Sequence, residues 1–151
     1  MSSTGEIRGS CLCSGIQYAA SRLVGPVLHC HCSMCRKATG AAFRTRVSVP
    51  SDALRWIEGE SLLGRYASSA GETRTFCTRC GATLFTFFRD HPTVLGLALG
   101  TLDTDPVLRP VAHVYVASKA PWYGMTDDLP QFAEALPAEF LAAWRDEFAA
   151  R

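Results

Sequence analysis

The seven cysteines of this 151-residue chain fall into three short groups, and clusters of this kind bind metals or carry out redox chemistry. Zinc requires four ligands that converge on one point at tetrahedral angles. Two cysteines with one or two residues between them supply two such ligands from a single turn. The spacing therefore predicts metal half-sites rather than scattered buried thiols. The groups are Cys11-Leu12-Cys13, Cys30-His31-Cys32-Ser33-Met34-Cys35 and Cys77-Thr78-Arg79-Cys80.

The first and last groups are pairs that lie far apart in the sequence. We expect Cys11 and Cys13 to bind one zinc ion together with Cys77 and Cys80, because a metal that joins distant pairs closes a long loop. Gly81 follows the second pair, and glycine can take a left-handed conformation that turns backbone N–H groups toward the sulfurs. These features predict a closed, structural four-cysteine site.

The middle group leaves three cysteines for a second zinc: Cys30, Cys32 and Cys35. Three protein ligands with one open vertex are typical of catalytic zinc. One alternative is a closed site, with a histidine as fourth ligand: His29, His31 or His113. Another alternative is a redox thiol cluster without metal. The odd number of cysteines fits a four-plus-three division better than any set of disulfide pairs.

Two cations next to Cys35 are candidate substrate contacts. Arg36 and Lys37 are placed to hold the carboxylates of a substrate, because the planar guanidinium suits paired hydrogen bonds to a carboxylate. The alternative is that both are ordinary surface charges. His31 is a candidate proton shuttle, although a residue between two ligands can instead face solvent. The spacing indicates no Ser/His/Asp triad and no catalytic pair of carboxylates.

The charge distribution bears on partners. No Asp or Glu occurs from Ile7 to Ser51, whereas six cations do, so a small anionic substrate would be drawn to this part of the chain. The alternative is that these cations form a solvated face that offsets the charge of the thiolates. The net charge is +1 and there is no basic tail, which argues against nucleic acid as a partner. No apolar run reaches the roughly 18 residues of a membrane span. The polar segment Met1–Ser10 does not resemble a signal peptide, so we expect a cytoplasmic protein with reduced thiols.

Most of the chain is predicted to form short strands. Phe43, Thr45, Val47 and Val49 alternate with polar or small residues, as in a half-buried strand. Further strands are expected at Leu54–Ile57, Leu62–Tyr66, Thr73–Cys77, Ala82–Phe88, Val94–Leu99 and Val111–Val116. After Pro137, one helical face carries Phe140, Leu141, Trp144 and Phe148, which predicts a terminal helix packed on the β core. We expect one domain, residues 1–151, that is mostly antiparallel β.

With these residues assembled, the sequence resembles the glutathione-dependent formaldehyde-activating enzyme family, which shares its domain with centromere protein V. The central block runs from Cys30 through Arg36-Lys37-Ala38-Thr39-Gly40 to Phe43. The flanking blocks are Gly9-Ser10-Cys11-Leu12-Cys13 and Phe76-Cys77-Thr78-Arg79-Cys80-Gly81. Later matches are Gly100-Thr101-Leu102-Asp103, His113, Pro121-Trp122 and Leu129-Pro130. The resemblance covers nearly the whole chain. Ser14 departs from it, because the family usually has glycine directly after the second cysteine, and we expect the metal ligands to be unaffected.

The resemblance implies an Mss4-like β-tent of stacked antiparallel sheets with zinc knuckles and a C-terminal helix. It also implies two zinc ions per chain, one on Cys11, Cys13, Cys77 and Cys80 and one on Cys30, Cys32 and Cys35. The implied activity is a carbon–sulfur lyase reaction in reverse, which joins glutathione and formaldehyde as S-hydroxymethylglutathione.

Two other functions compete with the enzyme. The first is a non-catalytic zinc-binding module with a labile second zinc. The second is a chromatin or cytoskeletal binding protein of the centromere branch, and the absence of a basic extension argues against it. The sequence itself does not separate the enzyme from the module, and it does not indicate an oligomeric state.

Overall fold

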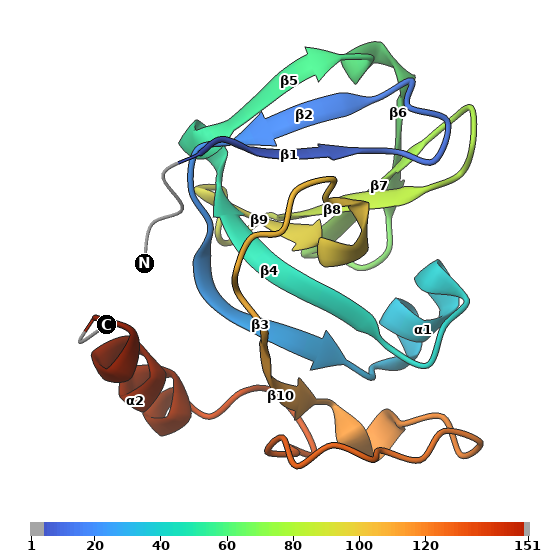
Figure 1. Cartoon of the computed structure of the whole chain (residues 1–151). Helices are drawn as coiled ribbons and strands as arrows, with labels where there is room; N and C mark the ends of the chain where they lie inside the picture. Colours follow the sequence, from blue (N-terminus) through green and yellow to red (C-terminus); the bar gives the residue numbers. More distant parts are fainter. Residues whose placement is uncertain (1–4, 150–151) are drawn as a thin grey trace. The chain divides into compact units, whose positions relative to one another are not determined.

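The computed structural model describes residues 5–149, and within them it contains ten strands, two α-helices and four short 3-10 turns (Figure 1). The chain divides into two compact units. Unit 1 contains Gly25–Arg46 and the residues from Arg109 on, and unit 2 contains the residues up to Val24 together with Val47–Leu108. Neither helix in the described part of the chain has the length and apolarity that a bilayer crossing requires.

Unit 2 consists of short antiparallel strands joined by tight turns. Three of them form a sheet in the order β1-β2-β5: β1 (Ile7–Ser10), β2 (Gln17–Ala20) and β5 (Leu54–Glu58). Four others follow one another as a meander: β6 (Leu63–Ala67), β7 (Glu72–Cys77), β8 (Thr83–Phe88) and β9 (Val94–Ala98). β4 (Arg44–Pro50) begins in unit 1 and ends in unit 2. The 3-10 turns are Ser51–Ala53, Glu60–Leu62, Leu99–Thr101 and Val116–Ser118.

The core of unit 2 is built on aromatic rings from both groups of strands. The Tyr18 ring of β2 meets the Phe85 ring of β8 edge to face at 4.9 Å, and Trp56 of β5 meets Phe85 at 5.4 Å. Both Tyr18 and Phe85 are fully buried. The Tyr18 hydroxyl forms a 2.6 Å hydrogen bond with the Thr101 side chain, which satisfies the polar end of a buried ring. These contacts hold β2 and β8, the strands that follow the first and last cysteine pairs in the chain.

Unit 1 contains β3 (Val24–Cys30), β10 (Pro110–Val114), α1 (Ser33–Thr39) and α2 (Ala138–Ala149). β3 and β10 pair in parallel, with His29 opposite His113 and Cys30 opposite Val114. The other edge of β10 is covered, since the His113 N–H donates to the Pro130 carbonyl. One buried cluster joins the strands to α1: Leu28, Cys30, Cys35, Ala112 and Val114.

The terminal helix was predicted from its apolar face, and the structure confirms it. Phe132, Leu136 and Phe140 pack against the buried cluster of unit 1, so α2 is fixed to the β core. The rings of Phe132 and Phe140 meet edge to face at 5.2 Å. Trp144 is half-buried on the same helix. The side chain of Phe148 lies outside the described part of the structure.

The mostly-β fold class is confirmed, with each of the seven predicted strands present. The parallel β3–β10 pair was not predicted, since only antiparallel sheets were expected. It joins segments about eighty residues apart in the chain. β1, β2, β3 and α1 were not predicted. The single domain of residues 1–151 stays a prediction.

Ser14 occupies a backbone conformation that normally belongs to glycine. Its φ is +60°, and its N–H donates to the Cys11 carbonyl, so Ser14 itself makes the left-handed turn of the first cysteine pair. Residues other than glycine are strained in the left-handed conformation because their Cβ atom approaches the following carbonyl oxygen. The turn keeps its shape, and the strain is borne by Ser14.

We therefore expect Ser14→Gly to stabilise the protein by about 0.5–1 kcal/mol, the strain relieved less the extra backbone entropy of glycine in the unfolded chain. Thermal melts of the metal-loaded protein measure the change. Ser21→Gly is the matched control: Ser21 is also an exposed serine outside the strands, but its φ is not positive, so the same substitution there should lower stability. Equal losses in both variants would contradict a strained Ser14.

Candidate metal centres

The first and last cysteine pairs meet in unit 2. The sulfurs of Cys11 and Cys13 lie 3.6 Å apart, and those of Cys13 and Cys77 lie 3.9 Å apart. With Cys80, all four sulfurs fall within 4.8 Å of one another. Four sulfurs placed tetrahedrally about 2.3 Å from one ion are about 3.8 Å apart, whereas a disulfide needs about 2.05 Å. The distances suit a shared metal and exclude a disulfide.

The turns around these cysteines direct backbone N–H groups at sulfur. The Ile16 N–H donates to the Cys11 sulfur at 3.2 Å, and Gly81 takes the expected left-handed conformation with φ +79°. A hydrogen bond from the Ala82 backbone N–H lowers the pKa of the half-buried Cys80 thiol to about 6, and the neighbouring cysteines add to the effect. Hydrogen bonds to the charged form favour the thiolate, which is the form that binds metals.

The second group lies in unit 1, where β3 ends and α1 begins. Cys30 is the last residue of β3, Cys32 precedes the first turn of α1, and Cys35 lies within that helix. The Cys35 N–H donates to the Cys32 sulfur at 3.3 Å, so Cys32 caps the helix. Hydrogen bonds with the thiols of Cys32 and Cys35, together with burial, raise the pKa of Cys30. These sulfurs also lie within 4.8 Å of one another.

No histidine completes the three-sulfur group in the described part of the chain. A fourth His, Asp, Glu or Cys ligand atom within 4.8 Å of all three sulfurs is absent there. The register explains this for two histidines. His29 pairs with His113 and Cys30 with Val114, and paired residues of neighbouring strands point to one face. His29 and His113 therefore face away from the Cys30 sulfur, and the geometry favours an open fourth position.

A chain of hydrogen bonds links two of these histidines to an aspartate. His31 Nε2 lies 2.8 Å from His113 Nδ1, and His113 Nε2 lies 3.0 Å from an Asp127 carboxylate oxygen. His31 and His113 are completely buried, so the alternative that His31 faces solvent is wrong. His29 bonds separately, through Nδ1 to the Thr45 hydroxyl at 2.8 Å. Sequence reasoning did not identify Asp127, because it is fourteen residues from His113 and has no motif around it.

The environment lowers the pKa values of His31, His29 and Asp127, which favours neutral imidazoles and an ionised carboxylate. Burial lowers the pKa of His31 to about 4, and electrostatic interactions with His113, His29, Lys119 and Arg36 add to the effect. Burial also lowers the pKa of His29. The hydrogen bond to His113 lowers the pKa of Asp127, which keeps that carboxylate ionised.

The two predicted cations have different surroundings. Arg36 is half-buried, and its Nε donates to the Ser118 carbonyl at 3.1 Å, which ties α1 to the segment after β10. Lys37 is exposed. Both stand in the last turn of α1, where cations stabilise the helix C-terminus. Lys119, which the sequence did not suggest, donates through Nζ to the Tyr123 carbonyl at 2.6 Å.

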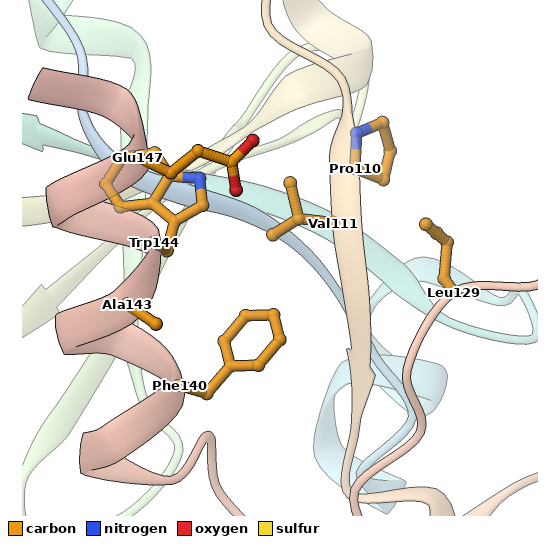
Figure 2. Close-up of a pocket in the computed structure, with 7 residues that line it drawn as sticks. All are labelled: Pro110, Val111, Leu129, Phe140, Ala143, Trp144 and Glu147. Atoms are coloured by element: carbon orange, nitrogen blue, oxygen red, sulfur yellow. The ribbon is translucent and has the colours of Figure 1, made fainter. Parts of the chain in front are cut away.

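A cavity of about 370 Å³ in unit 1 is separate from these groups (Figure 2). Figure 2 shows Phe140 and Trp144 of α2 pointing toward Val111 of β10. Pro110 and Leu129 also line it, and Glu147 is its one acidic residue. None of the cysteines or clustered histidines lines this cavity, so it is not part of the candidate metal centres.

Comparisons with known proteins agree with the cysteine pattern. The family model of the glutathione-dependent formaldehyde-activating enzyme matches residues 6–118. A Halomonas elongata protein provisionally named as such an enzyme is 27% identical over 148 residues, which cover 91% of this chain and 93% of that protein. An uncharacterised lyase of Schizosaccharomyces pombe is 34% identical over 80 residues, covering 53% of this chain and 56% of the lyase.

Among solved structures, a Rhodobacter sphaeroides protein known from a crystal structure superposes with a TM-score of 0.56. It is 24% identical, and the match covers 66% of this chain and 91% of the other. This likeness supports the fold alone.

The two cysteine groups should differ in their effect on folding. Cys80→Ser cuts a clamp that joins residues 64 apart, so we expect it to cost about 3 kcal/mol or more and to lower Tm by roughly 6–12 °C. Cys32→Ser should lower Tm by less than half as much, because its group spans six residues and serine still caps α1. Thermal melts compare the two variants, and a larger loss for Cys32→Ser would reverse the roles.

Metal affinity should follow the same division. Three thiolates and an exchangeable ligand hold a metal less tightly than four thiolates, so mild chelation should remove one metal ion per chain before the other. Metal analysis across a chelator titration measures this. Cys32→Ser should abolish the early step and leave the late one. Simultaneous loss of both ions would count against two unequal centres.

Proposed function

We propose, starting from the premise that the chain belongs to the glutathione-dependent formaldehyde-activating enzyme family, that it is a zinc-dependent enzyme of the carbon–sulfur lyase type. Its substrates in this proposal are a glutathione-like thiol and a small aldehyde. Cys11, Cys13, Cys77 and Cys80 hold a structural zinc, and Cys30, Cys32 and Cys35 hold a second zinc. The observation that carries the proposal is the three-sulfur group, which no fourth protein ligand completes in the described chain.

The reaction joins sulfur to the carbonyl carbon of the aldehyde. The thiol loses its proton, its sulfur forms a bond to carbon, and the electron pair of the carbonyl π bond passes to oxygen. The oxygen takes up a proton, so the product is a hydroxymethyl thioether, and the lyase direction reverses each change. Zinc in the three-sulfur group would supply the positive charge that keeps a bound thiol ionised near neutral pH.

The residues around the group suit an anionic thiol. Arg36 follows Cys35 and contacts Ser118, the residue before Lys119, so both cations place positive charge beside the three-sulfur group, where a peptide thiol would bring its carboxylates. Lys37 extends this positive surface from the same helix. The half-buried rings of Phe43 and Tyr123 lie 5.5 Å apart and limit the access of water to this side of unit 1. The chemistry requires reduced thiols, which fits a cytoplasmic protein.

A second candidate is a zinc module without turnover, whose second metal is labile. The observation that favours it is the structural role of the cations. Arg36 already bonds the Ser118 carbonyl, and Lys37 stabilises the end of α1. In this case neither cation is available for a substrate, and the three-sulfur group takes its fourth ligand from solvent.

Thiol binding separates the two candidates. We expect glutathione to alter the charge-transfer band of cobalt placed in the three-sulfur group and to release about one proton, because a free thiol with a pKa near 8.5 must ionise to bind. Calorimetry in buffers of different ionisation enthalpy counts the proton. A cobalt spectrum that no thiol changes would rule out the enzyme and favour the module.

Charge pairing gives a second arm of the test. Arg36→Ala should weaken glutathione binding about fivefold at low salt, since a partly exposed ion pair contributes up to about 1 kcal/mol. The effect should shrink as salt screens the charges. Lys37→Ala is the control with the same charge change on the same helix and should have the smaller effect. Equal affinities for Arg36→Ala and the unaltered protein would remove Arg36 from the proposed site.

A further inference from the structure

One nitrogen of the histidine chain differs from the others in its bonding. His31 Nδ1 is buried and has no hydrogen-bond partner within residues 5–149. His113, by contrast, bonds through both ring nitrogens, and His29 Nδ1 bonds to Thr45. A buried polar atom left unpaired costs about 1–3 kcal/mol, so native proteins rarely retain one without a function.

Asp127 determines which proton each ring carries. An ionised carboxylate only accepts hydrogen bonds, so His113 must donate its Nε2–H to Asp127. A neutral imidazole has one N–H, and His113 Nδ1 is then an acceptor. It accepts the Nε2–H of His31 across 2.8 Å. His31 Nδ1 is left as a bare acceptor, held in that state by two successive hydrogen bonds.

The residues around His31 offer no hydrogen-bond donor to its Nδ1 in the described part of the chain. His31 lies between Cys30 and Cys32 in the chain, and its ring centre is 5.0 Å from Phe43 and 6.3 Å from Tyr123. Aromatic rings offer no strong donor to a nitrogen lone pair. The His31 nitrogens also do not join the three sulfurs as a ligand. His31 directly follows Cys30, the last residue of β3, so its backbone adjoins the three-sulfur group.

We propose that His31 Nδ1 accepts a hydrogen bond from the substrate bound at the three-sulfur group, and that His113 and Asp127 are positioning residues that fix the acceptor form of His31. The donor is an N–H of the thiol substrate or the O–H created when the aldehyde adds. This inference rests on the proposed function. It assigns to His31 a contact with substrate rather than a ligand bond to the metal.

Nitrogen-15 NMR of histidine-labelled, zinc-loaded protein observes the acceptor directly. In the free protein, the His31 Nδ1 resonance should be that of an unprotonated nitrogen, and Nε2 should carry the proton. Glutathione alone forms one arm and glutathione with formaldehyde the other. An upfield shift of Nδ1 with glutathione alone identifies an N–H donor, and a shift that requires formaldehyde identifies the new hydroxyl.

The outcomes separate this inference from the proposed function. A protonated Nδ1 in the free protein overturns the inference. The inference is also overturned if the Nδ1 resonance stays unchanged in both arms while the cobalt band reports bound thiol. That result does not contradict the proposed function. If the cobalt band reports no thiol binding at all, the proposed function falls and the inference falls with it.

Asp127→Asn tests the positioning role. Asp127 also accepts the Leu129 N–H at 3.0 Å, and an asparagine oxygen keeps that bond while its NH₂ donates to His113 Nε2. Both imidazoles should then reverse, and His31 Nδ1 becomes a donor. We expect the NMR spectrum to show the reversal and the affinity for the substrate mixture to fall about tenfold, as for one lost hydrogen bond.

Asp128→Asn is the matched control, because it removes the same charge one residue away. It should leave both tautomers and the affinity unchanged. If Asp127→Asn leaves the tautomers as they were, or if both variants lose affinity equally, Asp127 does not position His31 and the inference is overturned.

Discussion

Cys13 and Cys77 are separated by 64 residues, yet their sulfurs lie 3.9 Å apart at the place where four thiols meet. Thiols gathered this closely repel one another once they ionise, and the backbone N–H groups around them favour ionisation. A cation at their centre resolves that conflict. In the proposed structural site, that cation would also tie the strand before Cys11 to the turn after β7, and unit 2 would depend on this convergence as well as on its aromatic core.

The three-sulfur group also gathers thiols that suit a metal ion, but it joins no distant parts of the chain. Its ligands come from six consecutive residues, and α1 would form around them through its own cap and through the Arg36 bond to Ser118. The alternation of side chains along β3 then separates two kinds of chemistry. Cys30 joins the buried apolar cluster on one face, whereas His29 and His113 lie on the other. The histidines are thereby free to bond with one another and with Asp127.

Much of the fold and of the sulfur groups could be predicted from the sequence, because local residue patterns determine them. Cysteine spacing predicted both sulfur groups, and the apolar face with Phe140 and Trp144 predicted α2. Alternation predicted the strand at Phe43–Val49, and short apolar runs bounded by turn residues predicted the other six. β3 was missed because Gly25 and Pro26 interrupt it, and α1 because its seven residues are too few for a periodic pattern. Ser14 shows that a turn can keep its geometry when its glycine is replaced.

The histidine chain could not be predicted, for a physical reason. It depends on the parallel register of β3 and β10, which joins His29 to His113, and on a loop that brings Asp127 to the far side of His113. Neither the register of a parallel pair nor the course of a loop follows from residue types. Sequence reasoning named His29, His31 and His113 as possible metal ligands and His31 also as a possible proton shuttle. It gave no basis for their bonding to one another.

The central claim is that one centre is closed by four protein thiolates and the other keeps an exchangeable position beside three. X-ray absorption at the zinc edge measures the ligands of both centres together. The account predicts about 3.5 sulfurs per zinc at about 2.3 Å, with the remainder a light atom of solvent, and about 4 sulfurs after glutathione is added. A scattering pattern of imidazole in the glutathione-free protein, unchanged by the thiol, would contradict it, because a histidine would then fill the open position.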